Sequence, residues 1–85
     1  MTAEAELPQV ESLKHRDVRD RWGIPDQSEG SVNNPRTREE NGIRFNEKWV
    51  YFLEGGGRRL VYWQRYDCRG VVREAPNGSI EPESL

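Results

Sequence analysis

Two segments rich in aromatic and β-branched residues decide the fold, Lys48-Trp-Val-Tyr-Phe-Leu53 and Arg58-Arg-Leu-Val-Tyr-Trp-Gln-Arg-Tyr66. Aromatic and β-branched side chains favour strands, and Glu54-Gly-Gly-Gly57 between the two segments supplies the residues of a turn. A connection this short joins neighbouring strands in the antiparallel sense. The stretch therefore predicts a β-hairpin, and seven of the eight aromatic residues of the chain lie between Phe45 and Tyr66.

Further strands are expected on both sides of this hairpin. Asp67-Cys-Arg-Gly70 has Asp at the first and Gly at the fourth position of a type I turn, and Val71–Glu74 follows it as a third strand. Upstream, Ile43–Phe45 is expected to pair with the start of the Trp49 strand across Asn46-Glu47. The sequence thus predicts a small antiparallel β-meander of three to four strands over about 43–74.

The first half of the chain is expected to be helical only in part. Residues 10–22 predict a helix that ends at Gly23-Ile24-Pro25 and docks through Leu13, Val18 and Trp22. We expect a flexible arm over 1–9, a polar linker over 23–41 and a flexible tail over 75–85. Within the linker, Asn34-Pro35 and Asn41-Gly42 suit the two ends of a short helix over 35–40. The fold class is then α+β.

Composition narrows the class of protein. Hydrophobic and charged residues each make up 33% of the 85 residues, and the formal net charge is -2. The mean hydropathy of -1.02 lies close to the range of disordered chains, which favours a fold that is only partial. The sequence pI of about 5.4 argues against a dedicated nucleic-acid-binding domain, which would usually be clearly basic.

Alternation along the strands leaves neither face of the predicted sheet clearly polar. Such a sheet packs one face on its own core and turns the other to the N-terminal segment or to a partner. Tryptophan, tyrosine and arginine dominate the hot spots of protein interfaces. The candidate interface residues are therefore Trp49, Arg59, Tyr62, Trp63 and Arg65.

Three interpretations of this aromatic and arginine-rich face stay open. The rings can form the core of a tiny sheet, since each aromatic side chain buries about 150–250 Å². They can instead present a surface to another protein, or to a second copy of the chain. As a third alternative, stacked rings and arginines suit single-stranded or regulatory DNA or RNA, although the acidic pI disfavours it.

The strand composition resembles that of WW domains, which bind proline-rich peptides on an aromatic sheet face. The resemblance rests on Trp49 and on Val61-Tyr62-Trp63 after a short turn. The second tryptophan of that family, and the proline after it, have no counterpart in Gly70–Pro76. The likeness is one of strand composition, and no binding residue is carried over from it.

Enzymatic chemistry has little support in the sequence. Cys68 is the only thiol, and His15 is the only histidine and lies far from it along the chain. Nucleophilic catalysis needs a base placed beside the nucleophile, and the carboxylate pairs have no metal-binding spacing. We therefore expect a non-enzymatic protein with no catalytic residue, no metal site and no cofactor.

The function expected from the sequence is that of a small protein-binding module or accessory subunit. Its aromatic and arginine-rich β-sheet face would contact a partner protein, and residues 1–41 would fold against that partner. No segment approaches the roughly 20 apolar residues of a membrane helix, and the acidic start lacks the apolar core of a signal peptide. A cytoplasmic location is expected.

Overall fold

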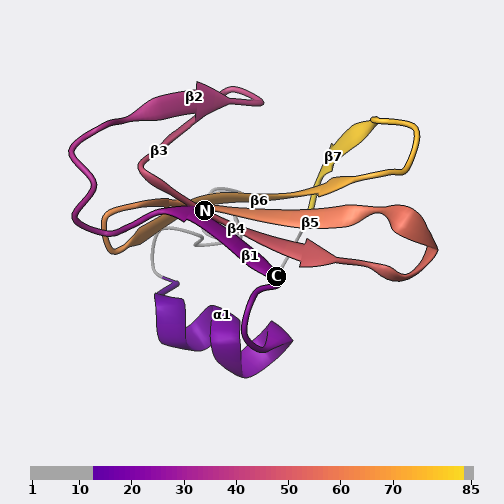
Figure 1. Cartoon of the computed structure of the whole chain (residues 1–85), viewed down its shortest axis with the longest axis horizontal. Helices are drawn as coiled ribbons and strands as arrows, with labels where there is room; N and C mark the ends of the chain where they lie inside the picture. Colours follow the sequence, from indigo (N-terminus) through magenta and orange to yellow (C-terminus); the bar gives the residue numbers. More distant parts are fainter. Residues whose placement is uncertain (1–12, 84–85) are drawn as a thin grey trace, which may run out of the picture.

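The computed structural model describes residues 13–83, which form one α-helix and seven strands in two sheets (Figure 1). The predicted class, a small α+β protein with an antiparallel sheet, is confirmed, but the expected three to four strands are too few. The helix α1 spans His15–Trp22. Residues 10–12 of the predicted helix and the predicted arm over 1–9 lie outside the described residues. Within residues 13–83, no helix is long and apolar enough to cross a membrane.

The expected pairing of Ile43–Phe45 with the Trp49 strand is wrong, because these residues pair with residues 38–40 in a separate sheet. The rest of the predicted meander forms the centre of the larger sheet. It consists of β4 (Glu47–Phe52), β5 (Arg58–Gln64) and β6 (Asp67–Glu74), and each strand is antiparallel to the next. The Gly-rich segment between β4 and β5 forms a turn of 3₁₀ helix, η3 (Glu54–Gly56). The turn after β5 lies earlier than expected, at Arg65-Tyr66, so Asp67–Gly70 belongs to β6 and not to a type I turn. Arg65 makes this tight connection possible by adopting a positive φ of 59°.

Two strands that the sequence did not predict complete this sheet in the order β1-β4-β5-β6-β7. The outer strand β1 (Gln27–Gly30) pairs with β4, and β7 (Ile80–Pro82) pairs with β6. Both are short and exposed. Gln27–Gly30 has no large apolar side chain, and Ile80–Pro82 has only three residues, too few to show an alternation. Part of the expected linker and part of the expected tail are therefore strands.

The smaller sheet is a hairpin of β2 (Arg38–Glu40) and β3 (Ile43–Phe45). Its turn is Asn41-Gly42, in which both residues have positive φ, 55° and 79°. That conformation suits a two-residue hairpin turn. The predicted short helix over 35–40 is wrong, because residues 38–40 pair with β3 as a strand.

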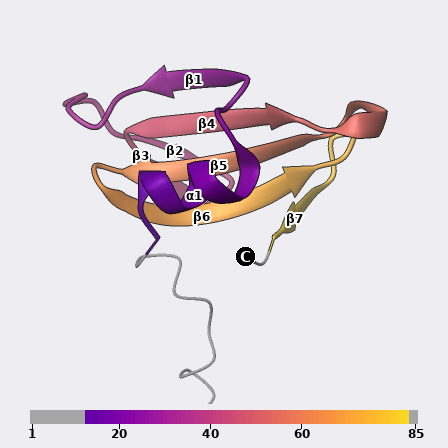
Figure 2. The ribbon, with the colours of Figure 1, turned by 90° about the horizontal axis from the view of Figure 1, so that it is seen from below.

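The larger sheet lies between α1 on one face and the β2–β3 hairpin on the other (Figure 1). On the helix side, which Figure 2 shows with α1 crossing the sheet, Val18 packs into a cluster formed by the strands. Leu13 and Trp22 pack against the same cluster, which confirms the predicted docking residues. On the hairpin side, Phe45 is buried and Ile43 packs beside it. The protein thus has two small cores that share one sheet.

Candidate functional site

The three aromatic residues predicted as interface residues lie in these cores. Trp49, Tyr62 and Trp63 are 5%, 0% and 0% exposed. Trp49 and Trp63 pack under α1, and Tyr62 packs under the hairpin. Their burial follows from the two layers that cover the sheet, one of which arises from residues expected to be a linker. In this conformation their rings offer no surface to a partner.

Arg59 and Arg65, the two arginines of the predicted interface, hold parts of the fold together. The Arg59 Nε and Nη2 atoms donate to the two carboxylate oxygens of Glu83 at 2.9 and 2.7 Å. The Arg59 guanidinium also lies 4.0 Å from the centre of the Trp22 ring. Arg65 donates from Nη1 to the Val32 carbonyl at 3.3 Å. Arg59 thus connects the end of α1, the sheet and β7.

The surface best suited to a ligand is a groove of about 690 Å³ at one end of α1. It runs between the helix, the segment after β1 and the β5–β6 turn. The ring of Tyr66, 63% exposed, stands at this groove. The lining residues are Lys14, His15, Arg16, Arg19, Ser31, Val32, Glu47, Trp49 and Tyr66.

The floor of this groove is an ordered set of aromatic and charged groups. His15 Nε2 lies 2.9 Å from Glu47 Oε1, and Trp49 Nε1 donates to Glu47 Oε2 at 2.9 Å. The His15 ring stacks on Trp63 with ring centres 3.8 Å apart and contacts the edge of Trp49. Glu47 therefore uses both oxygens inside the protein, and its charge is held at the floor.

The cations of the groove differ in how they are engaged. Lys14 forms an exposed ion pair with Asp67 at 3.2 Å. Among the ion pairs of residues 13–83, none includes Arg16 or Arg19. The described lining holds three cationic side chains, Lys14, Arg16 and Arg19, against the one carboxylate of Glu47, so the groove has an excess of positive charge.

A single buried side chain, Asn46, holds both rims of the groove. Its amide nitrogen donates to the carbonyls of Val32 and Asn34 at 3.3 and 3.0 Å. Its amide oxygen accepts from the Arg65 backbone N–H at 2.8 Å. The segment that carries Val32 and the turn that carries Tyr66 are thereby fixed to the same residue.

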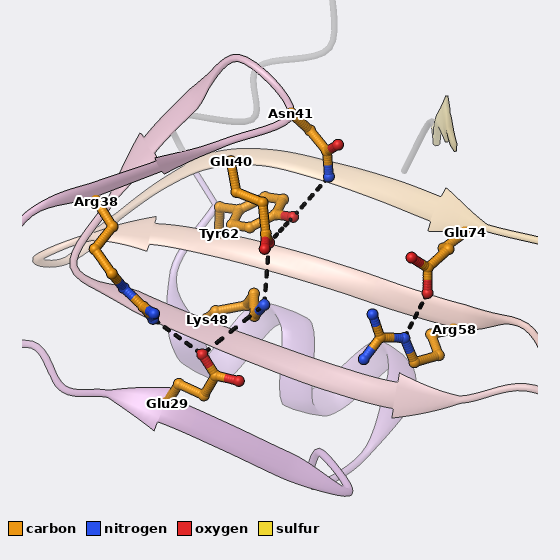
Figure 3. A network of polar contacts seen from close by, with 8 residues as sticks. All are labelled: Glu29, Arg38, Glu40, Asn41, Lys48, Arg58, Tyr62 and Glu74. Atoms are coloured by element: carbon orange, nitrogen blue, oxygen red, sulfur yellow. Dashed lines mark hydrogen bonds and ion pairs between the residues drawn. The ribbon is translucent and has the colours of Figure 1, made fainter. Parts of the chain in front are cut away.

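The opposite face of the sheet carries a polar network beneath the hairpin (Figure 3). Lys48 is buried and donates to Glu40 at 3.0 Å, while the Tyr62 hydroxyl donates to the same carboxylate at 2.7 Å. Asn41 in turn donates to the Tyr62 hydroxyl at 3.0 Å. Burial and the bond to Glu40 raise the pKa of Tyr62. Each of these groups is satisfied by its neighbours, so the network fastens the hairpin to the sheet.

Partial burial alone would raise the pKa of Glu40. The hydrogen bonds from Tyr62 and Lys48, with the charge of Lys48 and Arg38, together outweigh it and lower that pKa. Glu40 therefore serves as the charged acceptor of this network.

Cys68 does not have the environment of a nucleophile. It is buried under α1, and burial raises the pKa of its thiol to about 11. The reactive form of a cysteine is the thiolate, which burial disfavours. Within residues 13–83, no cluster of three or more His, Cys, Asp or Glu side chains is placed to hold a metal ion.

Sequence reasoning missed the groove because its parts are far apart in the chain. His15 and Glu47 belong to a helix and a strand separated by 32 residues, and Tyr66 was assigned to a strand and not to a turn. Arg16 and Arg19 are three residues apart, a spacing that places them on one face of the predicted helix, but the sequence did not show that this face would border a groove. Comparison of the chain with protein families, with curated proteins and with solved structures finds no match.

Proposed function

We propose that this chain is a small protein-binding module whose groove receives an acidic segment of a partner protein. The observation that carries the proposal is the gathering of Lys14, Arg16 and Arg19 around one groove with an exposed tyrosine. Among residues 13–83, the one carboxylate that lines the groove is Glu47, which is already bonded to His15 and Trp49. Complementary charge steers association and favours an acidic partner over a basic one.

An apolar or aromatic side chain of the partner would bind beside these cations. Tyr66 supplies an exposed ring, and Val32 supplies apolar surface in the same groove. Tyrosine and arginine are the residue types that contribute most at protein interfaces, and here both occur on a rigid support. The proposed ligand is thus a segment with carboxylates around one apolar anchor.

His15 adds a fixed hydrogen-bonding group to this surface. Because Nε2 is bound to Glu47, Nδ1 is the ring nitrogen that remains for a ligand. When the imidazole is neutral and Nε2 carries the proton, Nδ1 is an acceptor. A backbone N–H or a hydroxyl of the bound segment can then donate to it.

The proposal is tested by fluorescence polarisation with labelled short peptides that combine Asp and Glu with one central Trp, Phe or Leu. We expect saturable binding that weakens as salt is added, because the groove cations are exposed to solvent. The double variant Arg16→Glu/Arg19→Glu should weaken binding by at least about tenfold, and Tyr66→Ala should also weaken it.

The matched control is Arg21→Glu, on the same helix but in a different hollow, beside Asp17 and Asp20. It should leave peptide binding unchanged. Failure of all the peptides to bind, or equal binding by the double variant and the native protein, would overturn the proposal. A labelled oligothymidine is run in parallel, and preferential binding of that strand would assign the groove to single-stranded nucleic acid instead.

A further inference from the structure

A second hollow, of about 280 Å³, lies at the hairpin and is separate from the groove in its lining. It is lined by Thr37, Arg44, Gln64 and Arg69. These residues come from the segment before β2 and from β3, β5 and β6. Four segments thus contribute one side chain each to the same small surface.

Neither arginine of this hollow forms an ion pair with a carboxylate of residues 13–83. Ion pairs among residues 13–83 include Arg38, Arg58, Arg59 and Arg73, but neither Arg44 nor Arg69. Glu39 is opposite Arg44 in the hairpin register, and the two side chains still form no ion pair. Two guanidinium groups therefore face one hollow without a described counter-charge.

Arg69 owes its place to an irregularity in the sheet. Tyr62 of β5 is opposite Gly70, and the next residue, Trp63, is opposite Cys68. Arg69 is the extra residue between them, with no partner on β5. Bulges of this kind redirect a side chain and are common beside functional sites.

The neighbouring glycine allows the hairpin to lie close to this bulge. A Cβ atom on Gly70 would lie 2.8 Å from Ile43 Cδ1, which is too close for an ordinary contact. The absence of a side chain at this position lets Ile43 pack directly on β6. Because Arg44 follows Ile43 and Arg69 precedes Gly70, this contact brings the two arginines to the same surface.

We propose that this hollow is a binding site for a phosphate group. Two guanidinium forks can each make paired hydrogen bonds to phosphate oxygens, and the Thr37 hydroxyl and Gln64 amide add neutral donors. None of the described residues that line the hollow is a carboxylate, which would repel an anion. The chemistry is shared by inorganic phosphate and by a phosphate monoester.

The test is a titration of the ¹⁵N-labelled full chain, followed by NMR, with inorganic phosphate and separately with glycerol 3-phosphate at low ionic strength. We expect saturable shifts centred on Thr37, Arg44, Gln64 and Arg69, with the tighter ligand identifying the source of the phosphate. Arg44→Gln and Arg69→Gln should each weaken binding by at least about tenfold, since each removes charge-assisted hydrogen bonds.

Both substitutions are on exposed side chains, and the unchanged remainder of each spectrum would show that the variants fold. The matched control, Arg21→Gln, removes a cation far from the hollow and should leave the titration as in the native protein. Shifts that do not saturate, or that persist in both hollow variants, would overturn the site. Since this hollow shares no lining residue with the peptide groove, the result is independent of the proposed function.

Discussion

Gly30 at the end of β1 occupies a position that no other residue can fill without displacing the chain. Its φ is +74°, and a Cβ there would lie 2.2 Å from the backbone oxygen of Asn46. Gly42 has a similar φ of +79°, but a Cβ on it would meet nothing within 4 Å. A side chain at Gly42 would therefore cause backbone strain alone, whereas a side chain at Gly30 would cause both backbone strain and a steric clash.

We predict that Gly42→Ala lowers the free energy of unfolding by about 1–2 kcal/mol, the price of a left-handed conformation for a residue with a side chain. Gly30→Ala should lower it by clearly more, because the backbone must also move away from Asn46. Chemical denaturation of both variants under the same conditions measures the difference. Equal losses would mean that β1 shifts freely at Gly30.

At the residue scale, the sequence identified the important aromatic side chains, and of the interpretations it left open, the structure supports a core role for Trp49, Tyr62 and Trp63. Trp49, Tyr62 and Trp63 were assigned to strands correctly, and alternation placed Tyr62 on one face and Trp63 on the other. What the sequence could not show is that a separate layer covers each face. The role of Asn46 was equally hidden, because its three side-chain hydrogen bonds reach residues 12 to 19 positions away.

Two carboxylates fasten outer elements to the larger sheet. Glu40 holds the hairpin over one face, and Glu83, the residue after β7, is bound by Arg59 of β5. The hydrogen bonds from Arg59 lower the pKa of Glu83, against a smaller opposing effect of burial. The pKa of Glu40 is lowered as well. A carboxylate whose pKa is lower in the folded state adds stability above its ordinary value, 4.5 here. That contribution is lost as the pH falls through the folded-state value.

We predict that stability falls as the pH is lowered from 7 to about 3 and that Glu40→Gln/Glu83→Gln makes this fall shallower. Urea denaturation across the pH range is the measurement. Glu54→Gln, an exposed change on the η3 turn, should leave the pH dependence as in the native protein. A double variant with the native pH profile would show that neither carboxylate anchors its element.

The turn of the β2–β3 hairpin has a clear signal in the sequence, but its first strand does not. Asn-Gly is a strong signal for a two-residue hairpin turn, but Asn41-Gly42 also suits the end of a short helix that begins at Asn34-Pro35. The three residues of β2 are all charged and exposed, so the sequence shows no alternation of apolar and polar side chains there. In contrast, β4 and β5 were predictable because their burial on both faces demands a nearly continuous run of large side chains.

Over the whole molecule, α1 and the sheet share one core and should unfold together. Val18 is buried among strand residues, Trp22 lies against Tyr51, and the Tyr51 hydroxyl donates to the Gly23 carbonyl at 2.8 Å. In this structure α1 therefore belongs to the same folded unit as the sheet.

We predict that Val18→Ala lowers the free energy of unfolding by about 2 kcal/mol through the loss of two buried methyl groups and the cavity left behind. Helix content followed by circular dichroism and core packing followed by tryptophan fluorescence should show the same midpoint, before and after the substitution. A variant that loses helix signal first would indicate that α1 unfolds separately from the sheet.

The burial of Cys68 offers a way to measure how often α1 separates from the sheet. Because the chain has one cysteine and that thiol is sealed between α1 and the sheet, an alkylating reagent can label it only when this layer separates. The rate of modification of the unaltered protein thus reports how often the helix lifts from the strands. If a peptide bound in the groove stabilises the contact between α1 and the sheet, the rate of Cys68 modification should be lower in its presence.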